Sequence, residues 1–176
     1  MLVLRTMWKD WGLTTTLRGQ ATHFLELAKQ TRVGSEQEGY VRASILFSVM
    51  SFEAFFFREI IWGFIEQNSA TLDPKNAQKV DNGLNGRNGR FTGIKEAVKT
   101  WPCLLTRRAL DPSASADFVR LLEYRNALAH GDITKQLQGG KLAQEVETVA
   151  DAEFALNTIG EFKEHVARHF GFAPPP

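Results

Sequence analysis

The stretch that decides the fold is residues 43–65, ASILFSVMSFEAFFFREIIWGFI. It is the most apolar part of the chain and is nearly long enough to cross a bilayer. It also contains Glu53, Arg58 and Glu59. Placing one acidic side chain at the centre of a membrane costs about 2.5–3.5 kcal/mol. The sequence therefore predicts a long helix buried in a protein core and no membrane span.

Helical patterns also occupy most of the chain around this stretch. Apolar residues recur three and four positions apart, which predicts helices over about 14–33, 35–67, 92–101, 113–130 and 151–170. Residues 68–90 contain three Asn-Gly pairs, and this composition predicts a mobile surface loop. No alternating strand pattern of useful length is present, so we predict an all-α bundle of four to five helices.

Several helix ends carry local signals. Ser35 and Glu38 form a capping-box pattern at the start of the second helix. Pro102 is expected just past the end of the third helix, which Thr92 can cap. Residues 133–149 are ambiguous between a small hairpin and a simple interruption, and the last helix begins at Thr148 or Asp151. Residues 171–176 are expected to form a tail whose last three residues, Pro174, Pro175 and Pro176, are disordered.

Length and charge limit the possible classes of protein. The chain has 176 residues and a mass of 19.8 kDa, which predicts one domain over residues 1–176 with a core at about 14–170. A net charge of +1 excludes a protein that coats nucleic acid by charge alone. The single cysteine, Cys103, cannot form an internal disulfide. With no signal peptide visible, a reducing, cytoplasmic location is expected.

Two charged residues fall on apolar helix faces. At about 100° per residue, Arg125 lies in an arc formed by Phe118, Leu121, Leu122, Leu128 and Ala129. Glu53 lies among Leu46, Val49, Phe56, Phe57, Ile60 and Phe64. A covered guanidinium and a covered carboxylate each need a partner, so we expect the two helices to pack with Glu53 near Arg125. The alternative is a purely structural ion pair, or an arginine that reaches solvent along a groove.

The residues around Arg125 carry a more specific pattern. Residues 123–131 read EYRNALAHG, so Asn126 follows Arg125 directly and four residues separate Arg125 from His130. This stretch resembles the signature of the HEPN superfamily, which is an Arg, a polar residue and a His after four to six positions. A mid-helix acid on the long preceding helix, here Glu53, extends the resemblance. The resemblance covers about residues 14–170 and implies an up-and-down helical bundle.

The resemblance also implies partners and activities. HEPN domains usually form homodimers through the motif region, and many are metal-independent endoribonucleases, among them toxins and defence effectors. It therefore implies a homodimer joined near Arg125 and His130, an RNA substrate and, for a toxin, an antitoxin protein. Other HEPN domains have lost catalysis, so a non-catalytic, dimeric binding or regulatory module is the alternative.

Each candidate site residue has a chemical role that its side chain suits. His130 can act as general acid or base, and Arg125 can hold a phosphate and stabilise charge on its oxygens. Asn126 can orient the imidazole or contact the phosphate. Glu53 would orient Arg125, and Tyr124 could stack a base or be an ordinary surface tyrosine. No metal and no cofactor are expected to take part.

Two other clusters are weaker candidates. His165 and His169 lie four positions apart, which suits a metal, but no third ligand is near in the sequence and an exposed helix end is expected. Arg107 and Arg108 form a short basic pair. This pair is expected to be solvated, and the alternative is contact with an RNA backbone.

Overall fold

The protein is described here from a computed structural model covering residues 12–87, 91–130 and 148–173, apart from the side chains of Ala127, Ala129 and His130. The helices are α1 (Gly12–Gln30), α2 (Gly34–Ala54), a π-helical segment η1 (Phe55–Ile61), α3 (Trp62–Asn68), α4 (Pro74–Asn85), α5 (Ile94–Thr106), α6 (Pro112–His130) and α7 (Val149–Phe170). Because α2, η1 and α3 form one continuous helix, these residues make six helical segments and no strand. The all-α prediction is confirmed. Within the same residues, no helix has the length and apolar character needed to cross a bilayer.

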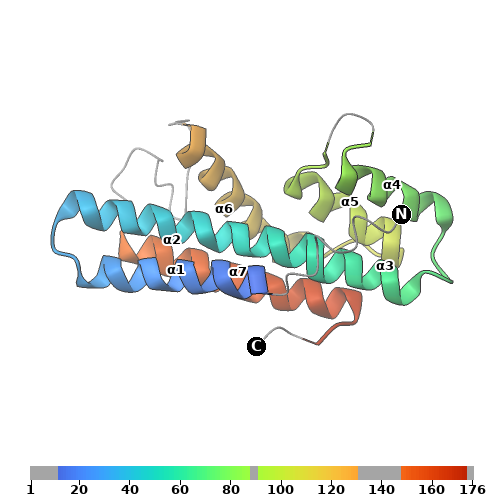
Figure 1. The fold of residues 1–176 in the computed structure, drawn as a ribbon, viewed down its shortest axis with the longest axis horizontal. Helices are drawn as coiled ribbons and strands as arrows, with labels where there is room; N and C mark the ends of the chain where they lie inside the picture. Colours follow the sequence, from blue (N-terminus) through green and yellow to red (C-terminus); the bar gives the residue numbers. More distant parts are fainter. Residues whose placement is uncertain (1–11, 88–90, 131–147, 174–176) are drawn as a thin grey trace.

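The long helices form the body of the molecule. α1 and α2 make an antiparallel hairpin, and α7 lies along both of them, as Figure 1 shows. α6 crosses the hairpin at an angle, while α4 and α5 gather at the end where α3 lies (Figure 1). This arrangement leaves α2 in contact with α1, α6 and α7, which explains why it is the most apolar part of the sequence.

The buried face of the continuous helix is a column of residue pairs. These pairs are Ser44 and Ile45, Ser48 and Val49, Ser51 and Phe52, Phe55 and Phe56, and Ile60 and Ile61. The pairs recur every three or four positions until η1, where the step becomes five. A π-helical turn closes i→i+5 hydrogen bonds and is wider than an α-helical turn. The wider turn therefore keeps the residues of η1 on the core side.

The expected mobile loop over 68–90 is wrong in its central part, which forms α4. Asp73 caps this helix by accepting hydrogen bonds from the backbone N–H groups of Lys75 and Asn76, at 2.8 and 3.1 Å. Pro74 occupies the first turn, where its missing N–H costs nothing. Gly86 ends the helix in the left-handed conformation, with φ 62°. Two of the three Asn-Gly pairs are therefore part of a helix or its end, and the third lies outside the described residues.

Two other predicted helix ends are also wrong. α2 starts after Val33 with no side-chain cap, so Ser35 and Glu38 do not form a capping box there; Glu38 instead pairs with Arg42. α5 starts after Gly93 and continues through Pro102 as far as Thr106. The predicted start of the last helix at Thr148 is confirmed, and Thr148 and Asp151 form a capping box there. The possible hairpin within 133–147 and the end of the predicted tail lie outside the described residues.

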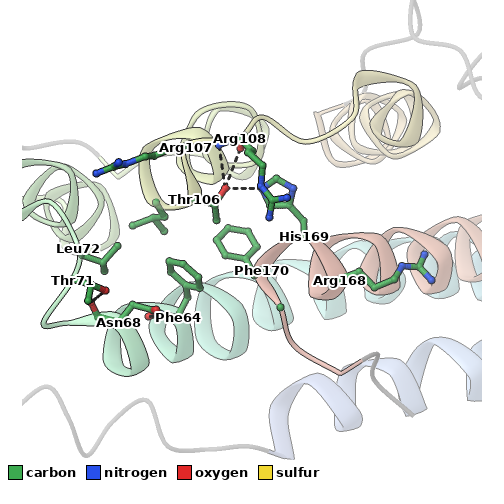
Figure 2. Close-up of a pocket in the computed structure, with 12 residues that line it drawn as sticks. Phe64, Asn68, Thr71, Leu72, Thr106, Arg107, Arg108, Arg168, His169 and Phe170 are labelled. Carbon is green, nitrogen blue, oxygen red and sulfur yellow. Dashed lines mark hydrogen bonds between the residues drawn. The ribbon is translucent and has the colours of Figure 1, made fainter.

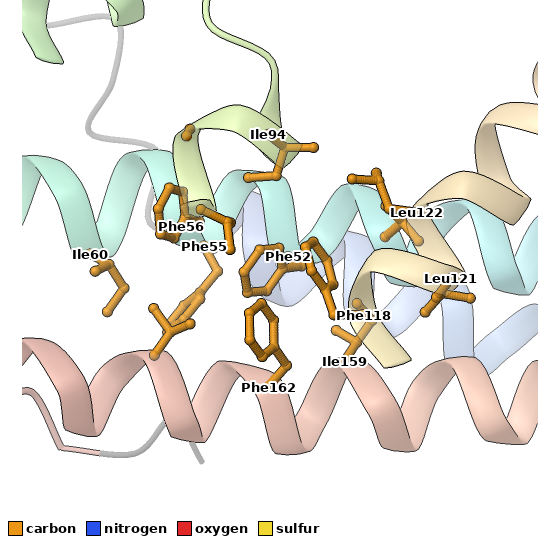
Figure 3. Packing of buried hydrophobic residues seen from close by; sticks show 14 of the residues in the cluster. Phe52, Phe55, Phe56, Ile60, Ile94, Phe118, Leu121, Leu122, Ile159 and Phe162 are labelled. Carbon is orange, nitrogen blue, oxygen red and sulfur yellow. The ribbon is translucent and has the colours of Figure 1, made fainter. Parts of the chain in front are cut away.

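Three phenylalanines pack against one another where α2, α6 and α7 meet. Phe52 of α2, Phe118 of α6 and Phe162 of α7 have ring centroids 4.4, 5.0 and 4.5 Å apart, and each ring is at most 2% exposed. Figure 3 shows them meeting where the three helices approach one another. Aromatic rings at this spacing contribute beyond the area that they bury. The cluster fixes the register between α2 and α6, on which the candidate site depends.

Candidate functional site

The candidate site is an ion pair between Glu53 of α2 and Arg125 of α6. The Arg125 Nη2 donates a hydrogen bond to the Glu53 Oε1. The aromatic cluster explains this meeting, because Phe52 precedes Glu53 and Phe118 lies seven positions, or two helical turns, before Arg125 on the same face of α6. Packing Phe52 against Phe118 therefore brings the two charged side chains to one place. The predicted approach of Glu53 to Arg125 is confirmed.

The pair lies at the border between core and solvent. The side chain of Arg125 is 21% exposed and that of Glu53 is 29% exposed. Burial raises the pKa of the Glu53 carboxyl, and the neighbouring Arg125 opposes that change. The Arg125 Nε is buried and has no hydrogen-bond acceptor among the described atoms. The guanidinium is thus anchored at one end and has a donor left over at the other.

The residues next to Arg125 divide between surface and core. Asn126 is exposed, so its amide is accessible to a ligand that approaches the ion pair. Tyr124 is fully buried, and the prediction that it lies on the surface, where it could stack a base, is wrong. Its ring packs into the main hydrophobic core. His130 is the last residue of α6, and its side chain lies outside the described part of the structure.

This arrangement can hold an oxyanion. A guanidinium has five N–H donors in a planar fork, and Glu53 engages it through one terminal nitrogen. Oxygen atoms of a phosphate can take up donors that the carboxylate leaves open. Arg125 and His130 lie five positions apart on α6, about 7.5 Å along the axis. Glu53 contacts only the arginine side of this site, which suits it to position Arg125.

A buried lysine, Lys163, was not among the residues predicted for this site. Lys163 of α7 is 3% exposed, and its Nζ donates a hydrogen bond to the Ser51 Oγ at 3.1 Å and lies 5.5 Å from the Phe55 ring centroid. Burial lowers the pKa of Lys163 to about 8, with Arg18 adding to the effect and Glu59 opposing it. The one available signal was that Lys163 follows Phe162 on the apolar face of α7.

The weaker histidine cluster also differs from expectation. His169 is half-buried, and its Nε2 lies 3.0 Å from the Thr106 Oγ1. His165 is also half-buried, so neither residue forms the exposed helix end that we predicted. In the part of the chain that the structure covers, no group of three or more His, Cys, Asp or Glu residues is placed to hold a metal ion.

Comparisons with known proteins gave no assignment. No protein-family profile matches the chain, and neither a curated protein nor a solved structure shows significant similarity to it.

Proposed function

We propose that the protein is a metal-independent endoribonuclease of HEPN type, with an up-and-down bundle fold and a homodimer that brings two copies of the motif to one cleft. The observation that carries this proposal is the state of Arg125. It is held by Glu53 of another helix, is about one-fifth exposed, and has a buried Nε without an acceptor among the described atoms. A phosphate that approaches from solvent can meet the exposed part of this side chain.

RNA supplies its own nucleophile for this reaction. The 2′-hydroxyl attacks the adjacent phosphorus, the 5′-oxygen of the next nucleotide leaves, and the product is a 2′,3′-cyclic phosphate. His130 serves as the general acid or base, since imidazole titrates near neutral pH. Arg125 stabilises the charge that develops on the phosphate oxygens. The exposed Asn126 contacts the phosphate or orients His130. DNA lacks the 2′-hydroxyl and is not cut.

The test is RNA cleavage in excess EDTA. Arg125→Ala and His130→Ala should each lower the cleavage rate by about 100-fold or more, because charge stabilisation and proton transfer each contribute at least that much. Arg125→Lys should also be slow, because an ammonium group lacks the bidentate fork. The products should end in a cyclic phosphate, and a substrate with a single 2′-deoxy nucleotide at the cut should be resistant.

Arg120→Ala is the matched control. Arg120 is on the same helix but is exposed and pairs with Asp117 at 3.4 Å, so its loss should leave cleavage unchanged. Melting curves must show that every variant is folded. Equal cleavage by wild type and the Arg125 and His130 variants would reveal a contaminating nuclease and overturn the proposal. The absence of cleavage over varied single-stranded and structured RNAs would also overturn it.

One observation favours the second candidate, a non-catalytic HEPN-like binding or regulatory module, which could include an antitoxin partner. Glu53 already neutralises much of the charge of Arg125, so a phosphate must compete with it. In that case Arg125→Ala should lower the melting temperature while RNA remains uncut by the wild type.

A further inference from the structure

A concave site lies at the end of the bundle where α3 lies. A cavity of about 380 Å³ opens where α3, α5 and α7 end (Figure 2). Its apolar lining consists of Phe64, Leu72, Leu105 and Phe170. The rings of Phe64 and Phe170 meet edge to face, with centroids 5.2 Å apart. The volume falls within the range of small-molecule sites, about 300–1,000 Å³, and the aromatic lining suits an apolar or aromatic group.

The polar lining of this cavity carries positive charge only. Arg107, Arg108, Arg168 and His169 line it, and no Asp or Glu is among its lining residues. Arg107 and Arg108 form no ion pair within the described part of the chain. In Figure 2 the guanidinium of Arg108 lies beside His169, and that of Arg107 extends on the side of Leu72. Two unneutralised guanidinium groups at one opening select for an anion.

The backbone holds Arg107 at this opening against its local preference. It ends α5 in the left-handed conformation with φ 61°, and among the described residues it is the one non-glycine residue with positive φ. Glycine is the residue that favours this position at a helix end. Local folding therefore does not account for an arginine here, whereas a role for its side chain would.

The turn that carries both arginines is fixed to α7. The Thr106 Oγ1 lies 2.8 Å from the Pro102 carbonyl oxygen and 3.0 Å from the His169 Nε2, and it accepts a hydrogen bond from the Arg108 N–H at 3.3 Å. Burial lowers the pKa of His169, and the charge of Arg108 lowers it further. The pKa of His169 therefore responds to a change of charge at the opening of the cavity.

We propose that this cavity binds a phosphate monoester carried on an aromatic group. The aromatic group packs against Phe64, Leu72 and Phe170, while Arg107 and Arg108 attract the phosphate from the two sides of the opening. Arginine suits a phosphate because its fork can engage two oxygens at once. The site is separate from the Glu53–Arg125 pair and does not depend on the ribonuclease proposal.

The test uses phenyl phosphate as the probe, with ionic strength held constant by chloride because salt screens such contacts. Binding is followed by titration of the His169 ring in NMR spectra, with exposed His23 as an internal reference. Bound phosphate should raise the pKa of His169. Phenol, which lacks the charge, and inorganic phosphate, which lacks the ring, should each bind at least about tenfold more weakly. Benzoate tests whether a carboxylate can replace the phosphate, and it should also bind more weakly.

Three variants separate binding from folding. Arg108→Ala and Arg107→Gly should each raise the Kd for phenyl phosphate about tenfold, and Arg107→Gly should do so while remaining at least as stable as wild type, because glycine suits its backbone. Arg120→Ala is the control, since Arg120 is exposed, pairs with Asp117 at 3.4 Å and is not among the residues that line the cavity. An unchanged Kd in the Arg107→Gly, Arg108→Ala double variant, or no response of His169 up to millimolar phenyl phosphate, would overturn the proposal.

Discussion

Lys163 is a charged residue whose buried surroundings disfavour its charge. Its amine is buried against the Phe55 ring, with Ser51 as its hydrogen-bond partner. Burial lowers its pKa from 10.5 to about 8. Below pH 8 the amine is protonated in both the folded and the unfolded chain, so the folded state bears the full cost of the buried charge. Above pH 10.5 the amine is neutral in both states and the cost is absent.

We predict that the free energy of unfolding of the wild type rises between about pH 8 and 10.5 on account of this residue. Lys163→Met removes the buried charge, so it should be more stable than wild type at pH 7 by about 1–3 kcal/mol, with the gain shrinking across that pH window. Urea unfolding at a series of pH values measures both. Lys99→Met, on the exposed side of α5, should change neither the stability at pH 7 nor its dependence on pH. A Lys163→Met protein with the wild-type pH profile would contradict the prediction.

At the residue scale, the sequence predicted where the charged residues meet but not which small polar residues are buried. The meeting of Glu53 and Arg125 followed from helical period and the cost of covering charge. The buried Ser44, Ser48 and Ser51 could not be predicted from hydropathy. Ser48 and Ser51 donate to carbonyls of their own helix at 2.8 and 2.7 Å, and Ser44 donates to the Ala21 carbonyl of α1 at 2.8 Å.

At the element scale, two helical glycines have opposite surroundings. A methyl group on Gly83 of α4 would lie 2.9 Å from the Trp101 ring and would also collide with the Thr92 side chain. The Gly83 carbonyl accepts a hydrogen bond from the Thr92 N–H at 3.0 Å, which holds the two segments together. A methyl group on Gly160 of α7 would meet nothing within 4 Å. Helix propensity favours alanine over glycine equally at both positions. Any difference in stability between the two alanine variants therefore comes from packing.

Gly83→Ala should therefore lower the free energy of unfolding by about 1–3 kcal/mol, because overpacking outweighs the gain in propensity. Gly160→Ala should raise it by about 0.5–1 kcal/mol. The midpoint of urea unfolding gives the stability change of each variant, provided that the m-value is unchanged. If the two variants shift in the same direction, the close packing of α4 on α5 is not as described.

The elements also show which local signals decide a helix. The start of α7 was predicted because the residues that cap it, Thr148 and Asp151, are near neighbours in the chain. α4 was missed because its composition favours turns. Its stability comes from the Asp73 cap and from contacts with α5, including a hydrogen bond from Asn76 to the Leu104 carbonyl at 3.1 Å. That contact spans 28 positions of sequence, which no local pattern can reveal.

For the whole molecule, the proposed homodimer makes a prediction about surface residues. Met50 is 43% exposed and lies three positions before Glu53, on the same side of α2 as the candidate site. Exposed large apolar side chains near a functional site suit an interface. Val33 is 55% exposed at the opposite end of α2. An interface through the motif region would cover Met50 and leave Val33 free.

Light scattering at micromolar concentration should therefore give twice the 19.8 kDa chain mass. Met50→Lys should shift the protein to the monomer, while Val33→Lys should leave the dimer intact. A monomer at every concentration would contradict the dimer, and a dimer that survives Met50→Lys but not Val33→Lys would place the interface elsewhere.

At this scale, the all-α architecture could be predicted because the dominant period was helical through most of the chain. The four or five predicted helices become six segments among the described residues, since α4 was not expected. The cavity between α3, α5 and α7 was beyond prediction, because its walls come from three helix ends that are distant in sequence.

The π-helical segment makes the chain tolerant of a change in length. A stretch of i→i+5 bonds within an α-helix holds one residue more than the plain helix would need. Glu53 lies before η1 and Phe64 lies after it, so the surplus residue separates the two sites. A related protein lacking one residue between 55 and 61 would have an ordinary α-helix there and would keep both flanks facing as they do now. The usual 100° per residue therefore does not predict which face of the helix a residue occupies when it is counted across η1.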